Sequence, residues 1–589
     1  MELPVISTGN APTMQNGHLT DRRKGITQFT VHIPDSDTRR GTPSSATTEA
    51  RWSTLEFRIY TMVFAVVVPL MVWIPYKLSD KLHANYLNYA YRLSDGWIPG
   101  RKADISDPQY RTFRRNIPAL IGLSVAYLAC SRLFSAFQPR YFPQWTKTWF
   151  LVAFEVCMLL LLHGIGAFKI GLIVFINWAL TAWAVRRVER GRAPTWLTPA
   201  IVWSFNGAML FANDYYEGYS LKAIHSSLAF LDSHSGLLPR WHVNFNITML
   251  RLISYGMDYH WASLNGRNDA SPSHRLSAQS TPPTLPSSYK ERVKTSLPLS
   301  AYSLADFFAY AIYPPLYIAG PIMSFNDFTW QIRYPAPPTR RALLNYAIRF
   351  LACLLTMEFV LHYLYVVAIK DSGAWHGDTP AELSMIGFWN LIVVWLKLLV
   401  PWRFFRLWAL ADGMDAPENM VRCMANNYST MGFWRSWHRS YNLWTVRYIY
   451  VPLGGSDNLI LATTLVFTFV ALWHDLSFRL LTWGWLISLF ILPEIIGKKI
   501  LPASRYGRNS WYRHVCAAGA VCNILLMMIA NLVGFAIGIE GVRYMLKELV
   551  ATWQGVYFVI FACSCIFVGV QIMFEYREEE LRQGVHRKC

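Results

Sequence analysis

The sequence predicts an all-α polytopic membrane protein whose chain forms one large integral domain. Hydrophobic residues make up 53% of the 589 residues, charged residues only 15%, and the mean hydropathy is +0.21. The apolar residues fall in runs of about 17 to 25, the length that a helix needs to cross the hydrocarbon layer of a bilayer. Lys and Arg lie mostly in short loops between these runs, as the cytoplasmic bias of basic loops predicts.

The net charge of +19 could suggest a nucleic-acid-binding protein. Its distribution argues against that, because the chain has no separate basic domain and no recognisable nucleic-acid module. The nine cysteines form no CxxC pair, and most lie inside apolar runs, where a free cysteine behaves as a small hydrophobic residue. We therefore expect the lipid bilayer as a partner, and we expect no nucleic acid, no metal and no redox centre.

The two ends of the chain are polar. Residues 1–55 are rich in Ser, Thr, Pro, Gly and Arg without apolar periodicity, which predicts a disordered tail. The first apolar run begins only near Arg58, so the tail is not a secretory signal peptide, and insertion would rely on the first membrane helix. Residues 56–575 form the expected membrane domain, with a Ser/Pro-rich basic loop at 265–294, and 576–589 form a charged C-terminal tail.

Within the membrane domain, we expect about ten to twelve transmembrane or re-entrant elements. The regular apolar runs lie at 61–75, 117–135, 148–167, 169–185, 195–213, 343–369, 384–411, 459–473, 480–496, 515–538 and 553–574. His163 lies in the third of these runs, and we favour a helix-packing or hydrogen-bonded histidine over a direct catalytic role. The basic cluster at 101–115 is typical of a solvated cytosolic face.

Three further stretches depart from simple spans. In 244–259, Asn246, Arg251 and Asp258 interrupt apolar sequence, so this helix is expected to face protein or a water-filled cavity. In 302–328, two Pro-containing sites rule out one regular helix and predict a kinked or re-entrant element. At the end of 384–411, several charged residues fit either snorkelling side chains or a site for an acidic head group.

The candidate site is the stretch 433–455, FWRSWHRSYNLWTVRYIYVPLGG, together with ALWHD at 471–475. It places His438 and His474 in oily sequence, where ionisable residues are costly and therefore usually functional. The two histidines are 36 residues apart, at either end of one short apolar span. They could converge on a shared cavity or lie at opposite membrane faces, and the residues alone leave both arrangements open.

The histidines suggest proton-transfer chemistry. A histidine can take a proton from a hydroxyl group and return it to a leaving group near neutral pH. The chain has no G-x-S-x-G elbow in a recognisable context, no P-loop, no HExxH and no dinucleotide fingerprint. Direct attack of an acceptor hydroxyl on a thioester, with one histidine as the general base, fits the residues present.

The stretch 433–455 followed by WHD resembles the signature of the membrane-bound O-acyltransferase (MBOAT) superfamily. YPPLYIAGPI and NITMLRLISY support this resemblance, which covers about residues 60–575. PWRFFRLWALADGMDAPENM, the WHRSYNLWTVRYIY run and MFEYREEE are similar to the family's fungal glycerol-uptake branch, which remodels GPI anchors and is related to hedgehog acyltransferase.

The resemblance implies an MBOAT-type helical core with its membrane elements around a central tunnel. It implies acyl-CoA as a co-substrate and no bound cofactor. By position, His474 matches the family's catalytic histidine, and His438 matches a second site residue that positions substrate or polarises the thioester; which of them moves the proton stays open. We expect these residues to bind substrate: Trp434, Arg435, Trp437, Asn442, Arg447, Tyr450, Trp473 and Asp475.

The implied reaction transfers a very long saturated acyl chain to a lysolipid, namely the lyso-phosphatidylinositol part of a GPI anchor. The expected partners are acyl-CoA and lysolipid or GPI-anchored protein substrates, and the expected location is the endoplasmic reticulum membrane, with the plasma membrane as a second location. An effect on glycerol uptake would then follow indirectly.

Two alternatives remain at the level of the sequence. A glycerol or polyol transporter would explain the broken segments, although the chain shows no convincing internal repeat. A protein palmitoyltransferase of the hedgehog-acyltransferase type would keep the fold and change the acceptor, and nothing in the residues alone excludes it.

Overall fold

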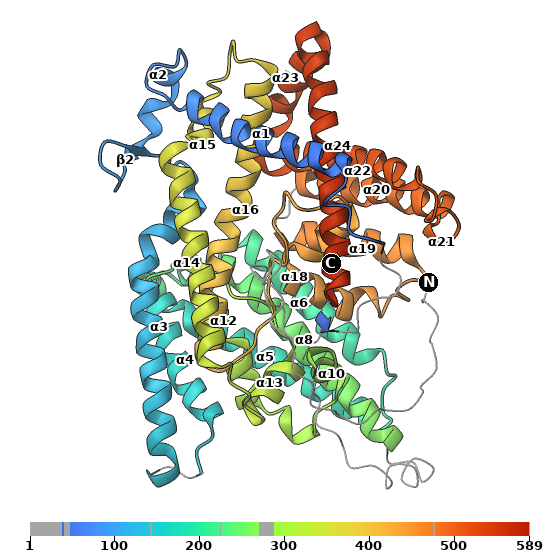
Figure 1. The fold of residues 1–589 in the computed structure, drawn as a ribbon. Helices are drawn as coiled ribbons and strands as arrows, with labels where there is room; N and C mark the ends of the chain where they lie inside the picture. The colour runs from blue at the N-terminus through green and yellow to red at the C-terminus, as the bar shows by residue number, and fades with distance from the viewer. Residues whose placement is uncertain are drawn as a thin grey trace.

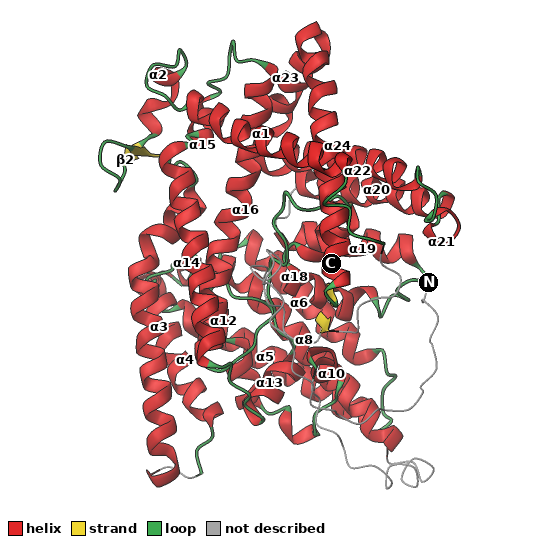
Figure 2. Cartoon of the chain, viewed as in Figure 1, coloured by secondary structure: helices red, strands yellow, loops and turns green. Residues whose placement is uncertain are grey.

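The regular structure of the described residues is almost all helical, as predicted from the sequence (Figure 2). This computed structural model describes residues 38–40, 48–141, 144–223, 225–269, 288–474 and 478–587. Within these residues, the β-structure consists of two short antiparallel pairs. One joins β1 (Thr38–Arg40) to β4 (Val585–Arg587), and the other joins β2 (Ser94–Asp95) to β3 (Lys102–Ala103). Much of the predicted tail and of the basic loop lies outside the described residues.

Eight of the described helices are long and apolar enough to cross a membrane. They are α1 (Leu55–Leu78), α3 (Pro108–Tyr141), α5 (Gly166–Glu189), α14 (Arg340–Tyr363), α16 (Pro380–Ala411), α20 (Phe478–Ile500), α22 (Tyr512–Asn531) and α24 (Trp553–Arg582). Five further helices accompany them: α4 (Lys147–His163), α6 (Leu197–Tyr215), α8 (Trp241–Asp269), α19 (Leu459–His474) and α23 (Gly538–Ala551). Each predicted span overlaps one of these helices. The span expected at 343–369 is interrupted, because α14 ends at Tyr363 and a separate short helix, α15 (Val366–Ser372), follows, and α23 was not anticipated.

Helix α16 forms the interior of the molecule. It begins at a capping box, in which the Thr379 side chain accepts from the backbone N–H of Glu382 and Pro380 occupies the first turn. In the most apolar stretch of α16, 56% of the residues are buried, whereas only 6% are buried in the corresponding stretch of α1. Helix α16 therefore packs against protein, while the side chains of α1 are exposed to lipid. In Figure 1, α3, α14 and α16 stand together on one side, and α20, α22 and α24 gather on the other.

The predicted break in the backbone is present and is buried inside the protein. The chain forms three short helices, α11 (Leu304–Ala311), α12 (Pro314–Tyr317) and α13 (Phe325–Arg333). Two of the backbone carbonyls released by the break are satisfied by Arg251 of α8, which donates to Ala311 O at 2.8 Å and to Leu316 O. A fully buried guanidinium therefore stabilises the irregular backbone at this depth.

Helix α8 faces protein, as its polar residues predict. Arg251 and Asp258 are buried and hydrogen-bonded. The buried His163 is bonded at both ring nitrogens: Nδ1 lies 2.8 Å from Leu238 O and Nε2 lies 2.9 Å from the Tyr317 hydroxyl. His163 is thus the hydrogen-bonded packing residue that we favoured above.

The charged residues at the end of α16 pair within the protein. Arg406 donates to Ala416 O at 2.7 Å and to Asp415 at 3.1 Å. Asp412 accepts from the hydroxyls of Tyr127 and Tyr313. These bonds fix the loop that follows α16, which carries a residue of the candidate site.

The two ends of the described chain meet beside α24. The backbone N–H of Arg51 donates to Glu575 at 3.0 Å, and Arg582 donates to Thr48 O at 2.9 Å. Helix α24 continues to Arg582, so the boundary drawn at residue 576 falls inside this helix, and the buried Glu580 pairs with Arg422 at 2.7 Å.

Candidate active site

His438 lies in the tight connection between α17 (Thr430–Ser436) and α18 (Arg439–Thr445). Its backbone is left-handed, with φ 43° and ψ 51°, at the residue that precedes α18. This conformation is unfavourable for a residue with a Cβ atom by about 1–3 kcal/mol and is concentrated at functional sites. The surrounding structure must therefore hold His438 in place.

Asn419, in the loop after α16, provides part of that support. Its backbone carbonyl accepts from the N–H of Arg439 at 3.0 Å, and its side-chain Oδ1 accepts from the N–H of Ser440 at 3.1 Å. The Ser440 hydroxyl in turn accepts from the N–H of Ile322 at 2.9 Å, in the broken segment between α12 and α13. The start of α18 is thus bound to two other parts of the chain.

The imidazole of His438 lies between two aromatic rings. Trp402 of α16 stacks on it with ring centroids 4.5 Å apart, and Tyr441 stacks on it at 5.3 Å, with interplanar angles of 23° and 18°. Tyr441 follows one turn after His438 in α18, which brings the two side chains to the same face. The orientation of the ring is therefore restricted by neighbours from two helices.

His474 is the last residue of α19 and approaches the same tyrosine. The Tyr441 ring lies 4.7 Å from Trp473 and 6.4 Å from His474, measured between centroids. Of the two arrangements that the sequence left open, the structure has the convergent one, because both histidines neighbour Tyr441. His438 is half-buried and His474 is exposed.

The end of α19 is fixed to α8 by a reciprocal pair of hydrogen bonds. Trp473 donates from its indole N–H to Asn246 O at 2.8 Å, and the Asn246 side chain donates to Trp473 O at 3.4 Å. Asn246, which interrupts an apolar helix in the sequence, thus positions the residue next to His474.

Arg447 is half-buried and forms an ion pair with a buried carboxylate. It lies in the π-helix η7 (Val446–Tyr450) and donates to Asp258 at 2.7 Å, with its guanidinium 4.9 Å from the ring centre of Trp261. Asp258 also accepts from the N–H of Asn326 at 3.1 Å. The Arg447 charge is thus paired with a carboxylate that joins η7, α8 and α13.

The other residues expected to bind substrate lie in several different environments. Trp434 packs on Trp483 with centroids 5.4 Å apart, and Trp437 stacks on Phe433 at 5.4 Å. Arg435 is exposed, and Asn442 and Tyr450 are half-buried. Asp475 lies outside the described residues.

Trp402, Asn419 and Tyr441 are the site residues that sequence reasoning missed. All three lie in stretches that carry the family resemblance, yet their residue types do not distinguish them from ordinary core residues. Only the contacts with His438 and with the start of α18 reveal them.

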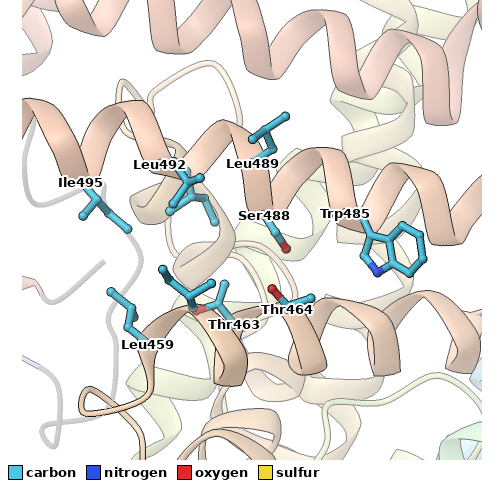
Figure 3. A pocket seen from close by; sticks show the side chains of 10 residues that line it. Leu459, Thr463, Thr464, Trp485, Ser488, Leu489, Leu492 and Ile495 are labelled. Carbon is cyan, nitrogen blue, oxygen red and sulfur yellow. The ribbon is translucent and has the colours of Figure 1, made fainter.

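A separate groove lies between α19 and α20 (Figure 3). It encloses about 260 Å³ and is lined mainly by apolar side chains, with the hydroxyls of Thr463, Thr464 and Ser488 among them. Helix rise places Thr464 about 15 Å from His474 along α19. The groove is therefore not the place where the histidines converge.

The site can support proton transfer at an acyl group. The rings of His438 and His474 both neighbour the Tyr441 ring, and in the described part of the chain no group of three His, Cys, Asp or Glu residues could hold a metal ion. A neutral imidazole beside a substrate hydroxyl can accept its proton as a general base.

Known proteins resemble this chain over most of its length. The profile of "MBOAT, membrane-bound O-acyltransferase family" matches residues 227–539, which include both histidines. The chain is 44% identical to "Membrane-bound O-acyltransferase GUP1" of Saccharomyces cerevisiae over 93% of this chain and 95% of that protein. It is 40% identical to the gup1 protein of Schizosaccharomyces pombe over 94% of each. A more distant relative, "Protein-cysteine N-palmitoyltransferase HHAT" of Mus musculus, is 26% identical over 44% of this chain and 54% of that protein.

Proposed function

The chain belongs to the membrane-bound O-acyltransferase family, and from this premise we propose that it transfers a long-chain acyl group from acyl-CoA to a hydroxyl group of a lysolipid. The acceptor in this proposal is the lyso-phosphatidylinositol part of a GPI anchor, in the endoplasmic reticulum membrane. The single observation that supports the chemistry best is the convergence of His438 and His474 on Tyr441.

The proposed reaction is a direct transfer. One imidazole takes the proton of the acceptor hydroxyl as its oxygen attacks the thioester carbonyl carbon. A C–O bond forms, the C–S bond breaks, and the same imidazole returns the proton to the departing CoA thiolate. No acyl-enzyme is needed.

We assign the base to His474 and a positioning role to His438. His474 is exposed and belongs to the family's WHD signature, so its ring is accessible to an acceptor. His438 is stacked between Trp402 and Tyr441, an arrangement that suits orientation of the acyl donor better than repeated movement of a proton.

The preference for O-acyl transfer over transfer to a protein rests on the distribution of similarity. The GUP1 proteins match nearly the whole chain at 40–44% identity, whereas the protein palmitoyltransferase matches less than half of it at 26%. Transfer to a protein is therefore the second candidate, and it keeps the same two histidines.

Microsomes from cells whose only acyltransferase of this family is one variant of this protein would test the proposal. With labelled acyl-CoA and lyso-phosphatidylinositol, His474→Ala is expected to lower acyl transfer by about 10²–10⁴-fold, the usual effect of losing a general base. His376→Ala is the matched control, because His376 is exposed and remote from the site. Transfer by His474→Ala at the control rate would reject the assignment.

The acceptor is tested in cells that lack the gene. We expect their GPI-anchored proteins to retain lyso-lipid anchors and to regain full-length acyl chains when the wild-type gene is restored. Unchanged anchors together with a missing protein-bound acyl group would favour the palmitoyltransferase alternative. Glycerol flux into proteoliposomes holding only this protein would favour the transporter.

A further inference from the structure

The hydroxyl group of Tyr441 has no hydrogen-bond partner among the described residues, although the side chain is only 5% exposed. A buried tyrosine hydroxyl normally finds a partner, because leaving it without one is unfavourable by about 1–3 kcal/mol. Such an unpartnered group in a native structure calls for an explanation.

The other buried tyrosines of the described chain show how unusual this is. Eleven of them form a hydrogen bond through the hydroxyl: Tyr89, Tyr110, Tyr127, Tyr255, Tyr302, Tyr310, Tyr313, Tyr317, Tyr346, Tyr365 and Tyr448. Their partners are carbonyls, carboxylates, an amide and an imidazole. Tyr441 is the exception among these buried tyrosines, although the hydroxyl of the half-buried Tyr219 also lacks a partner. Tyr441 is also the tyrosine that contacts both candidate catalytic histidines.

The ring of Tyr441 is held rigidly. His438 stacks on it at 5.3 Å with an interplanar angle of 18°, and Trp473 lies against it at 4.7 Å with an angle of 30°. Trp473 is itself fixed to α8 through Asn246. The phenol is therefore oriented in advance, in a buried environment where a hydrogen bond to developing charge is strong.

We infer that Tyr441 is a third catalytic residue, whose hydroxyl donates a hydrogen bond to the carbonyl oxygen of the acyl thioester. The inference rests on the proposed acyl transfer. When the acceptor oxygen adds to the carbonyl carbon, the C=O electrons move to oxygen, and the Tyr441 O–H stabilises the resulting oxyanion without losing its proton. Collapse of this adduct re-forms C=O and expels the CoA thiolate. The thiolate then accepts the proton that the imidazole took from the acceptor hydroxyl.

Tyr441→Phe tests the inference, because it removes the hydroxyl and keeps the ring that stacks on His438. We expect kcat to fall by about 10²–10³-fold, the effect of removing one oxyanion donor, while KM for acyl-CoA changes little. Tyr89→Phe is the matched control: it also removes a buried hydroxyl, which bonds to Leu78 O far from the histidines, and kcat should stay at the wild-type value.

A binding measurement separates this role from a structural one. Two stable acyl-CoA analogues are compared: a ketone, in which CH₂ replaces sulfur and the carbonyl remains, and a thioether, which lacks the carbonyl oxygen. We expect the wild type to prefer the ketone and Tyr441→Phe to lose that preference, with thioether affinity unchanged. An unchanged kcat, or an equal loss of affinity for both analogues, would overturn the inference. If the wild type transfers no acyl group at all, the proposed function itself fails.

Discussion

At the scale of single residues, the site depends on a histidine in an unfavourable backbone conformation. His438 has a positive φ of 43°, and the hydrogen bonds that hold it come from the neighbouring Arg439 and Ser440, which are bound by Asn419. The aromatic stack with Trp402 and Tyr441 then orients the ring. The effects of these hydrogen bonds and of the aromatic stack should be measurable in variants that keep both histidines.

Asn419→Ala should lower both stability and activity. It leaves the buried N–H of Ser440 without its side-chain acceptor, which is unfavourable by about 1–3 kcal/mol. We expect a lower thermal midpoint in detergent and a reduced kcat, because the start of α18 next to His438 loses one of its two hydrogen bonds to Asn419 and keeps only the one to the backbone carbonyl. Asn419→Asp retains an oxygen acceptor and should recover most of the activity. An Ala variant with wild-type stability and rate would contradict this role.

Trp402→Ala should reduce the rate without removing any reacting group. It frees one face of the His438 ring, so kcat should decrease several-fold, whereas Trp402→Phe keeps an aromatic face and should lose much less. Initial rates of acyl transfer at saturating acyl-CoA distinguish the Ala variant from the Phe variant. Equal rates for Ala and Phe would show that stacking does not orient the histidine.

At the scale of elements, the broken segment α11–α13 depends on α8. Arg251→Met should remove the donors that satisfy Ala311 O and Leu316 O, and hydrogen bonds from charged groups contribute about 1.5–3 kcal/mol each. We expect loss of most folded protein on size-exclusion chromatography, with partial recovery in Arg251→Lys. A well-folded Met variant would mean that the break is stable without this guanidinium.

The pair of Arg447 and Asp258 tests whether Arg447 holds structure or substrate. Arg447→Met leaves the buried Asp258 carboxylate unpaired and should destabilise the protein by about 3–5 kcal/mol, whereas Asp258→Asn leaves the half-buried Arg447 unpaired and should destabilise it less. The double variant should recover much of that stability. If the folded double variant also has a normal KM for acyl-CoA, Arg447 serves the structure; a strongly raised KM would support the substrate-binding role expected from the sequence.

Most elements could be predicted because their signals are local. Apolar runs of spanning length marked α1, α3, α16 and α24, and Pro314 with Pro315 marked the break. Helix α23 was missed because it is short and carries charged residues between two apolar runs. The partnership of Asn419 with the start of α18 could not be predicted, because its donors are the backbone N–H groups of Arg439 and Ser440, about 20 residues away, and backbone groups carry no sequence signal.

At the scale of the whole molecule, the site is produced by packing between distant parts of the chain. Trp402 comes from the interior helix α16, Tyr441 from α18, and Asn246, which positions Trp473, from α8. The spacing of 36 residues between His438 and His474 fits convergence and separation equally well. Only the docking of α19 against α8 and α18 decides between them, because helix packing depends on all the side chains at each interface.

The central claim is that His438 and His474 act at one catalytic centre, and a double-mutant cycle on kcat tests it most directly. Purified protein in lipid nanodiscs would be assayed for CoA release from acyl-CoA in the presence of lyso-phosphatidylinositol. Residues that act as a unit are strongly non-additive, so the double variant His438→Ala/His474→Ala should be about as slow as the slower single variant. A double variant slower by the product of the two single effects would place the histidines in independent roles and contradict the account.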